Sequence, residues 1–478
     1  MVQNMFTFRG RGSELARLEE IYERERFRTC AVYGRRRIGK TTLLERFCEN
    51  RRNVYVQFVK GTERDNLKSC STALSILSPG AEIDSFAKFL EVLKGICSEE
   101  KTVIVFDEYP YLSQLGEVYS SELQHFADWL MKRSDSMLII CGSSASMILS
   151  EIAEVNRPLY GRFYHRMELK PMTLSETAEF HPGMSTEALL RLYLTIGGVP
   201  SYHEMTSLPT YRENVEERML CGVAMENEVF SYLGELGDVG RFSPVLLALS
   251  DGVCTVRAMS DRLGVPESTL RDHVSKLEGL GIVSKVDGMA EGRAPAYVIS
   301  DYLTSFYYDV FVRNSSVFSS RRGVERYGTV ESAIDTHLGR VFEQYCRDFV
   351  ACCYPCTYTG TWRGTVLVRD EDGAVERDES GKPVTEVADI DVVAVLRNGV
   401  NRIDVFGECK FRRRPMGVSD LEMLRTRVAT ACPKGNIRLV LFSLGGFTGD
   451  LTDVTDGESV VLFDLESLTG GHDPPDIH

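Results

Sequence analysis

The sequence GRRRIGKT at residues 34–41 has the spacing of a phosphate-binding loop. Its two glycines leave backbone N–H groups open toward phosphate oxygens, and a helix that starts at the second glycine favours negative charge. An apolar stretch, CAVY, precedes the loop, and a helix-like stretch, TTLLERFCEN, follows it. We therefore expect Lys40 to reach the β- and γ-phosphates of ATP or GTP, and the Thr41 hydroxyl to bind Mg²⁺. The expected nucleotide-binding residues of the loop are Gly34, Arg35, Arg36, Arg37, Ile38, Gly39, Lys40, Thr41 and Thr42.

Two adjacent acids follow a second apolar stretch, in VIVFDEYPYL. Asp107, at the end of the expected strand, can hold Mg²⁺ through water. Glu108 can orient the attacking water and deprotonate it. A solvated strand end would explain the same two residues, but the phosphate-binding loop upstream favours a site for a nucleotide and Mg²⁺.

Two more residues could contact the nucleotide. Ser143 ends the apolar stretch MLIICGS and could sense the γ-phosphate, although a plain turn into a helix explains this pattern as well. Arg162 lies in PLYGRFYHRMEL, just before another expected strand. We expect it near the carboxyl edge of the sheet, where it could contact a phosphate of its own subunit or of a neighbour. A surface salt bridge is the alternative.

A second group of charged residues lies toward the end of the chain. Asp391 falls in the β-like run ADIDVVAVL, and Glu408 and Lys410 fall in RIDVFGECKF. Because strand side chains alternate, Glu408 and Lys410 share one face, and Asp391 joins them if the two runs form a hairpin. Two carboxylates can hold Mg²⁺ and so activate a phosphodiester, while a lysine stabilises developing negative charge. Glu343, on an amphipathic helix at 337–350, could add a third carboxylate.

The thirteen cysteines indicate no metal centre. Cys353 and Cys356 form a CxxC pair, with Cys346 and Cys352 nearby, but no second pair supplies the four ligands of a structural zinc site. We expect the cysteines to be reduced, small core residues.

Charge argues against extensive contact with nucleic acid. The chain carries 55 Lys and Arg against 69 Asp and Glu, a net charge of −14. Residues 241–330 carry 11 Lys and Arg and 10 Asp and Glu, and residues 331–478 carry 16 and 25. Since phosphate neutralisation drives this kind of binding, a local basic groove would be needed. The run Arg412, Arg413 and Arg414 could supply one, or it could be a solvated strand end.

The composition is that of a globular protein, with 43% hydrophobic and 26% charged residues over 478 positions. This length suggests about three domains. No apolar stretch approaches the ~18 residues of a membrane span, and the N-terminal sequence MVQNMFTFRGRG lacks the apolar core of a signal peptide. We expect a cytoplasmic protein without a membrane partner.

The elements that position these residues follow from hydrophobic patterning. Strand-like and helix-like stretches alternate up to about residue 170, which predicts an α/β fold with a parallel sheet covered on both faces. The expected strands are 30–34, 53–59, 102–107, 137–143 and 166–169. Two of the expected helices are 14–26 and 121–131.

The middle of the chain reads mostly as helices. A capping box between Thr173 and Glu176 opens a helical segment that we expect to form a lid. Three helix-like stretches and two strand-like ones follow, which is the order of a winged helix-turn-helix. Such a segment could read DNA or could be a structural or partner-binding module, and the near-neutral charge of residues 241–330 favours the second role. The third stretch, 266–281, is the expected recognition helix. Its expected outward-facing residues are Ser268, Thr269, Arg271, His273 and Lys276.

These patterns predict an ordered set of domains. The expected boundaries are 1–170 for a P-loop core, 171–240 for a helical lid, 241–313 for a winged helix, 314–330 for a linker and 331–478 for a C-terminal α/β domain. A charged segment at 369–383 is expected to be an exposed hairpin loop.

The segments GRRRIGKTTLL, FDEYPYL, ICGSSASM, PLYGR and IGGVPSY, in this order, resemble a prokaryotic group of AAA-type, STAND-like P-loop ATPases, the archaeal ATPase group. The resemblance spans about residues 5–310. It implies an extra strand between the P-loop strand and the strand that ends in Asp107. It also implies Glu108 as the catalytic glutamate, Ser143 as a sensor, and a helical lid before a winged helix. The shared PLYGR segment supports a role for Arg162.

The order of Glu343, Asp391 and Glu408-Cys409-Lys410 resembles the PD-(D/E)XK nuclease fold and the C-terminal domain found on this ATPase group. This second resemblance spans about residues 331–465. Asp389 stands where a glutamate often precedes the metal-binding aspartate in similar proteins.

The combined expectation is an Mg²⁺-dependent ATPase coupled to a metal-dependent nuclease-like domain that acts on or binds nucleic acid. The expected catalytic residues are Glu108, Glu343, Asp391, Glu408 and Lys410. The expected metal ligands are Thr41, Asp107, Asp391 and Glu408. An alternative is an ATP-driven switch that binds protein, DNA or a second copy of the chain without cleavage. A transcription regulator that reads DNA with its winged helix is a third hypothesis.

Overall fold

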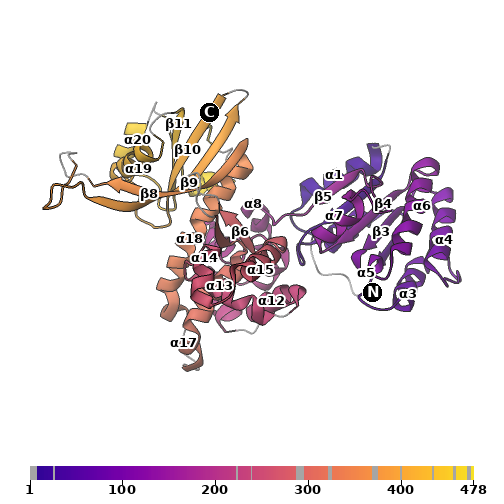
Figure 1. Ribbon diagram of the computed structural model, residues 1–478. Helices are drawn as coiled ribbons and strands as arrows, with labels where there is room; N and C mark the ends of the chain where they lie inside the picture. The colour runs from indigo at the N-terminus through magenta and orange to yellow at the C-terminus, as the bar shows by residue number, and fades with distance from the viewer. Residues whose placement is uncertain are drawn as a thin grey trace. The chain divides into compact units, whose positions relative to one another are not determined.

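The computed structural model describes residues 8–24, 27–221, 224–237, 239–286, 295–320, 326–368, 375–398, 401–432, 435–455, 459–470 and 475–477. The chain divides into two compact units (Figure 1). The first unit comprises Met1–Phe180 and Gly198–Glu204, and the second comprises His181–Gly197 and Met205–His478. The chain therefore passes from one unit to the other more than once.

The first unit is built on a five-stranded parallel sheet with the order β2-β3-β4-β1-β5. Its strands are β1 (Thr29–Tyr33), β2 (Asn53–Gln57), β3 (Val103–Asp107), β4 (Met137–Gly142) and β5 (His165–Glu168). All five strands expected from the sequence are confirmed, with ends shifted by one or two residues. β4 lies between β1 and β3, so the extra strand implied by the resemblance is present.

Helices lie on both sides of this sheet in Figure 1. The helices of the first unit up to Phe180 are α1 (Gly12–Arg24), α2 (Lys40–Cys48), α3 (Glu63–Leu74), α4 (Phe86–Glu99), α5 (Pro110–Ser113), α6 (Glu117–Arg133), α7 (Ala145–Ala153), α8 (Leu174–Thr177) and η1 (Ala178–Phe180). Every residue of β3 and β4 is buried, because helices cover both faces. This explains why these strands read as continuous apolar runs. The last two residues of the expected helix 14–26 lie outside the described residues.

The segment expected as a lid is shared between the two units. The capping box of Thr173 and Glu176 is present and starts α8 in the first unit. Helix α9 (Thr186–Ile196) belongs to the second unit, and most of α10 (Pro200–Met205) returns to the first. Within the second unit, Arg191 of α9 forms an ion pair with Asp335 at 2.9 Å, and the Tyr193 ring packs edge-on against two other tyrosine rings. Residues 171–240 thus contain elements with different packing partners.

The winged-helix order is present in the second unit. Its helices and strands are α13 (Ser243–Ser250), α14 (Val256–Leu263), α15 (Glu267–Gly279), β6 (Val283–Val286) and β7 (Ala296–Ile299). They are preceded by α11 (Tyr211–Asn214), η2 (Val215–Leu220), α12 (Ala224–Leu233), η3 (Gly234–Leu236) and η4 (Val239–Arg241). β6 and β7 pair antiparallel, and the loop that joins them, 287–294, lies outside the described residues. On α15, Leu270, Val274 and Leu277 are buried on one face, as their spacing predicts.

The stretch 314–330, expected as a polar linker, contains helical structure. After α16 (Tyr302–Phe306), η5 (Tyr307–Phe311) and η6 (Val312–Asn314), the short helix α17 (Ser315–Ser320) follows, and α18 (Tyr327–Cys353) begins before residue 331. No helix in the described part of the chain has the length and apolar composition needed to cross a membrane.

The C-terminal part is a mixed five-stranded sheet with the order β12-β11-β10-β9-β8. Its elements after α18 are β8 (Cys356–Leu367), β9 (Thr385–Asn398), β10 (Asn401–Lys410), α19 (Val418–Ala431), β11 (Ile437–Ser443), α20 (Gly449–Thr455), β12 (Val460–Phe463) and α21 (Leu465–Leu468). β8, β9 and β10 form an antiparallel meander, and β10, β11 and β12 run parallel. The hairpin expected between the Asp391 and Glu408 runs is therefore present. In the charged segment 369–383, residues 369–374 lie outside the described residues, and Arg377 and Pro383 form an isolated antiparallel bridge.

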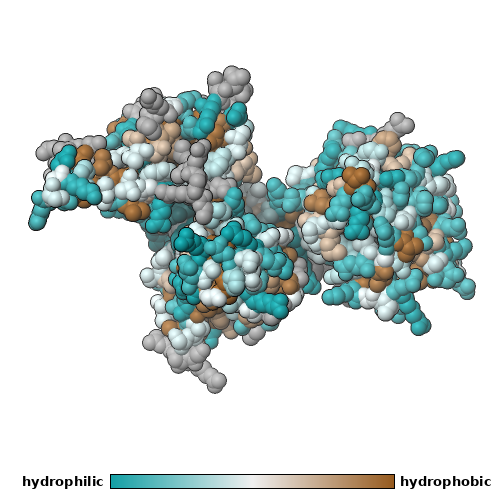
Figure 2. All heavy atoms as spheres, in the orientation of Figure 1, coloured by the Kyte–Doolittle hydropathy of each residue, from teal (hydrophilic) through white to brown (hydrophobic). Residues whose placement is uncertain are grey.

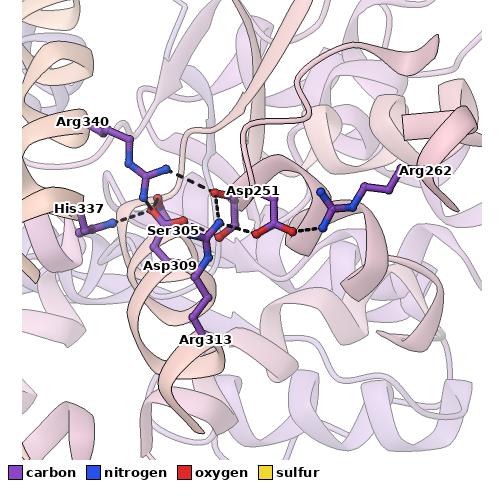
Figure 3. A network of polar contacts seen from close by, with 8 residues as sticks. Asp251, Arg262, Ser305, Asp309, Arg313, His337 and Arg340 are labelled. Atoms are coloured by element: carbon purple, nitrogen blue, oxygen red, sulfur yellow. Dashed lines mark hydrogen bonds and ion pairs between the residues drawn. The ribbon is translucent and has the colours of Figure 1, made fainter. Parts of the chain in front are cut away.

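A network of polar contacts, here called the Asp309 network, joins the winged-helix elements to α18 (Figure 3). Its members are Ser250, Asp251, Arg262, Ser305, Asp309, Arg313, His337 and Arg340. The Asp309 carboxylate accepts hydrogen bonds from the Ser250 hydroxyl at 2.6 Å and from His337 Nδ1 at 2.8 Å, and pairs with Arg340 at 3.0 Å. His337 is fully buried, and its Nε2 has no hydrogen-bond partner among the described residues.

Candidate functional site

The phosphate-binding loop connects the carboxyl end of β1 to the start of α2. Gly34 lies so close to β5 that a Cβ atom there would be 2.5 Å from the Leu169 carbonyl oxygen. Gly39 has φ 90° and precedes the first turn of α2, a conformation that favours glycine. That first turn contains no acidic residue, so the positive end of the helix dipole faces an uncompensated site. Ile38 is buried, while Arg36, Arg37 and Thr42 are exposed.

Lys40 is buried and lies against the loop that it is expected to serve. Its Nζ donates hydrogen bonds to the carbonyl oxygens of Gly34 at 2.9 Å and Arg35 at 3.1 Å. The Arg35 guanidinium lies 6.0 Å from the centre of the Tyr202 ring. The loop carbonyls thus satisfy the buried ammonium group.

The acidic residue at the end of β3 meets two hydroxyl groups. Asp107 is fully buried, and its Oδ2 accepts hydrogen bonds from Thr41 Oγ1 and from the Tyr55 hydroxyl, each at 2.8 Å. Its Oδ1 accepts a hydrogen bond from the Glu108 backbone N–H at 2.9 Å. Burial and the Asp107 carboxylate raise the pKa of Tyr55 above its ordinary value, so the phenol stays protonated. A hydroxyl and a carboxylate in contact are oxygen ligands of the kind that Mg²⁺ takes, so these residues fit the ion.

Glu108 and Ser143 lie together at the same edge of the sheet. The Ser143 hydroxyl donates to Glu108 Oε2 at 3.1 Å, and its backbone N–H donates to the same oxygen at 3.3 Å. Glu108 has φ 51°, which is uncommon for a residue with a side chain and is held here by its surroundings. The hydroxyl of the next residue, Ser144, caps α7 by accepting from the Met147 N–H.

Arg162 does not lie where we expected it. β5 runs parallel to β1, and Arg162 precedes the start of β5. Its carbonyl oxygen accepts a hydrogen bond from the Thr29 hydroxyl at the first residue of β1, 2.7 Å away. Arg162 is therefore at the amino edge of the sheet, opposite the loop that follows β1, and the expected place at the carboxyl edge is wrong. Its guanidinium Nε lies 3.4 Å from Asp128 Oδ1, as the salt-bridge alternative predicts.

The second predicted set of residues comes together in the C-terminal sheet. The name acidic cluster is used here for Glu343 of α18, Asp391 of β9, and Glu408 and Lys410 of β10. Burial, with the Asp391 carboxylate acting in the same direction, raises the pKa of Glu343 to about 7. Burial also raises the pKa of Asp391 to about 6, with the Glu408 charge acting in the same direction. The carboxylates are thus near enough to act on one another in a desolvated place.

Two cations already hold Glu408. Its Oε1 pairs with Lys410, and its Oε2 accepts a hydrogen bond from Arg427 Nη1 at 2.9 Å. Asp391 Oδ2 accepts a hydrogen bond from the Cys409 backbone N–H at 2.9 Å. Across the described ranges, no group of three or more His, Cys, Asp or Glu side chains is arranged to hold a metal ion. In this form the acidic cluster is an ion-pair network and does not fit a metal ion as it stands.

The expected basic patch after β10 is largely paired within the protein. Arg412 forms two hydrogen bonds with the Asp420 carboxylate at 3.0 and 3.1 Å. Arg413 lies 3.3 Å from Glu187 of α9. Arg414 is exposed. The CxxC cysteines, Cys353 and Cys356, are free thiols at the end of α18 and the start of β8.

The outer face of α15 differs from expectation at one residue. Ser268, Thr269, Arg271 and Lys276 are exposed, as expected. His273 is half-buried, because its ring packs edge-on against Phe242 with the ring centres 5.3 Å apart. Arg271 pairs with Glu267 and Lys276 pairs with Asp272, which leaves this helix face close to neutral. Figure 2 shows a mostly hydrophilic surface over α14 and α15.

Sequence reasoning missed two residues of these sites. Tyr55 sits in β2 with no motif around it, and Arg427 sits in the middle of α19. The one available signal for Tyr55 is its place near the end of a strand that precedes the acidic pair. No local pattern indicates that Arg427 reaches back to β10.

Comparisons with known proteins support an ATPase domain and a helix-turn-helix segment in this chain. Residues 8–205 match the model of an ATPase domain predominantly from Archaea, and residues 243–285 match that of bacterial regulatory proteins of the arsR family. An uncharacterized protein of Methanocaldococcus jannaschii is 28% identical over 349 residues, which cover 72% of this chain and 77% of that protein. A solved structure of a Walker-type ATPase of Pyrococcus abyssi has a TM-score of 0.52 at 18% identity, covering 63% of this chain and 96% of the other. The chain carries a P-loop ATPase domain and a helix-turn-helix segment.

Proposed function

We propose that the protein binds MgATP in the loop between β1 and α2, hydrolyses it, and uses this cycle to control how the second unit engages nucleic acid. The observation that carries the proposal is the 2.8 Å contact between Thr41 Oγ1 and Asp107 Oδ2. It brings the hydroxyl at the start of α2 to the buried carboxylate at the end of β3, beside a lysine and a glutamate suited to phosphate chemistry.

The carbonyl oxygens of the loop and the phosphate oxygens of a nucleotide are alternative partners for Lys40. When a triphosphate binds, Lys40 leaves the carbonyl oxygens of Gly34 and Arg35 for the β- and γ-phosphate oxygens. The N–H groups from Gly39 to Thr42 face the phosphates at the positive end of α2. Thr41 and Asp107 would hold Mg²⁺, which would neutralise phosphate charge.

Glu108 is the proposed general base. Its carboxylate accepts from Ser143 in the described structure, so Ser143 holds the base at the edge of the sheet where the γ-phosphate arrives. A water between Glu108 and the γ-phosphate would lose its proton to this carboxylate. Because Arg162 lies at the opposite edge, we propose that it serves a nucleotide only in a neighbouring copy of the chain.

ATP turnover by the full chain tests this proposal. Lys40→Ala should abolish nucleotide binding, and Glu108→Gln should keep binding but block hydrolysis. Arg46→Ala is a matched control, because Arg46 lies on the exposed face of α2 and pairs with Glu49. Hydrolysis by purified Glu108→Gln at the wild-type rate would refute the assigned base.

For the second unit, we propose contact with duplex DNA through α15. The match of residues 243–285 to a regulatory helix-turn-helix model supports this, together with the exposed Arg271 and Lys276. Because both cations have acidic partners on the same helix, we expect weak, strongly salt-dependent binding. Arg271→Ala should weaken it, while Arg46→Ala should not. No binding at low salt would exclude this role.

A second candidate function is phosphodiester cleavage by the acidic cluster. The convergence of Glu343, Asp391, Glu408 and Lys410 favours it, as does the order of α18, three antiparallel strands and α19. A panel of DNA and RNA substrates with Mg²⁺ or Mn²⁺, with and without ATP, tests this activity. Cleavage that is lost in Lys410→Ala would establish it.

The paired state of Glu408 favours binding without cleavage. Both of its oxygens are engaged by Lys410 and Arg427, and the C-terminal part carries 25 acidic against 16 basic residues. No cleavage together with measurable ATP hydrolysis would support a nucleotide-driven switch. In that case protease sensitivity of the chain should differ between ADP and ATP.

A further inference from the structure

We propose that Tyr55 is a positioning residue of the ATPase site, whose phenol fixes the Asp107 carboxylate in the orientation that Thr41 and nucleotide-bound Mg²⁺ require. This inference rests on the proposed function and adds a residue that none of the sequence motifs includes.

The backbone of β2 places the phenol within reach of Asp107. Tyr55 pairs in register with Val105 of β3, two residues before Asp107. Its neighbours Val54 and Val56 are buried on the other face of the strand, while Tyr55 is only half-buried. The ring therefore does not pack in the core that contains Val54 and Val56. Its hydroxyl extends along the sheet and donates a hydrogen bond to Asp107 Oδ2.

Donors from three elements fix the carboxylate of Asp107. Oδ2 accepts from Tyr55 of β2 and Thr41 of α2, and Oδ1 accepts from the backbone N–H of Glu108. A buried carboxylate needs such donors because burial removes its hydration. The backbone donor fixes Oδ1, and the two hydroxyl donors fix Oδ2.

The two hydroxyl donors have different fates when nucleotide binds. Thr41 would present a lone pair of its oxygen to Mg²⁺ while its hydroxyl hydrogen donates to Asp107, so the position of this oxygen depends on the ion as well as on the carboxylate. Tyr55 has no proposed contact with the nucleotide, and its bond can persist through the cycle. Tyr55 is thus the side-chain donor that holds the orientation of Asp107 independently of the ion.

Tyr55→Phe tests the inference because it keeps the ring and removes only the hydroxyl. We expect kcat for ATP to fall about tenfold, which corresponds to about 1.4 kcal/mol for a hydrogen bond to a charged group, with KM changed less than twofold. The Mg²⁺ concentration for half-maximal binding of a fluorescent ATP analogue should rise by a similar factor. Binding of the same analogue in EDTA should not change.

Tyr119→Phe is the matched control. Tyr119 belongs to the core of the same unit, and burial and the nearby Glu63 carboxylate raise the pKa of its phenol, but it contacts none of the proposed nucleotide residues. Its Mg²⁺ dependence and kcat should equal those of the wild type. Equal effects in both variants, or a loss of kcat in Tyr55→Phe that matches its loss of folded protein, would overturn the inference.

The two proposals fail in different ways. If the wild type does not hydrolyse ATP, the proposed ATPase mechanism fails, but the Mg²⁺ titration of analogue binding still decides the role of Tyr55. An unchanged Mg²⁺ dependence in Tyr55→Phe beside normal wild-type hydrolysis would refute the positioning role alone.

Discussion

Replacing Asp309 by alanine should destabilise the second unit more than any exposed charge replacement. Asp309 is the common acceptor of the Asp309 network, and its side chain is only 5% exposed (Figure 3). Alanine would leave the Ser250 hydroxyl and His337 Nδ1 without their acceptor in a buried place. His337 would then have both ring nitrogens unsatisfied, since its Nε2 already lacks a partner among the described residues.

The magnitude follows from these contacts. Each buried donor left unpaired costs about 1–3 kcal/mol, and loss of one partner of a buried ion pair costs about 3–5 kcal/mol. The Arg340 side chain is 46% exposed, so water replaces much of its interaction with Asp309. We therefore expect Asp309→Ala to lower the free energy of unfolding by about 2–5 kcal/mol, and Asp309→Asn, which keeps an acceptor, to lower it less.

Urea unfolding of the full chain, with hydrogen exchange in α13 and α18 to identify the transition, measures this effect. Asp272→Asn is the control, because Asp272 forms an exposed pair with Lys276 on α15 and should leave the transition unchanged. A loss below ~1 kcal/mol in Asp309→Ala would show that the network does not hold α18 to the winged-helix elements.

Three further predictions concern the second unit. Burial lowers the pKa of His337 below 6.5, so on acidification the unfolded chain binds a proton at this residue before the folded chain does. The free energy of unfolding should therefore fall as the pH drops below about 6.5. Urea midpoints at pH 7.5 and 5.5, compared with those of His337→Gln, check the sign of this effect. Arg191→Ala should cost about 1–2 kcal/mol, because it removes an ion pair to α18 and a cation–π contact of 5.2 Å with Phe411; a midpoint shift indistinguishable from zero would contradict this. Arg412→Ala should lower the free energy of unfolding by about 1 kcal/mol, because it removes two hydrogen bonds to the Asp420 carboxylate. Arg413→Ala should not shift the urea midpoint, because the Arg413 side chain is 81% exposed. A larger effect of Arg413→Ala than of Arg412→Ala would refute the reasoning.

The first sheet could be predicted because its signals are local. Buried parallel strands read as apolar runs, and the loop at residues 34–41 carries its own spacing. Asp107, Glu108 and Ser143 meet because each lies at or directly after the carboxyl end of a strand in one parallel sheet. Strand direction alone was enough to bring these residues to one edge.

Residues whose place depends on packing between distant segments could not be predicted in the same way. Arg162 is a separate case, because strand direction already places a residue that precedes a parallel strand at the amino edge, and the expected carboxyl edge misapplied this rule. Tyr55 reaches Asp107 only through the pairing of β2 with β3, which the sequence does not state. His273 fits the spacing of an outer face, yet the Phe242 ring covers it.

The sequence predicts that the residues of the acidic cluster lie together, but it does not predict the ion pairs that they form. Alternation along β10 puts Glu408 and Lys410 on one face, and the hairpin with β9 adds Asp391. Arg427 enters from α19, a separate helix, and no spacing rule connects it to β10. Its presence turns a set of carboxylates expected to bind metal into a network of ion pairs.

Helix α18 carries residues of two polar clusters, and these residues must keep a fixed rotation relative to each other about the helix axis. His337 of the Asp309 network and Glu343 of the acidic cluster lie six residues apart on it, which is ~9 Å along the axis. Inserting one residue between them would rotate one feature by about 100° relative to the other, so both could not keep their partners. The loops of the C-terminal sheet can change length without this penalty. A recombination that exchanges this sheet for another must therefore carry α18 with it, and its crossover point belongs before His337.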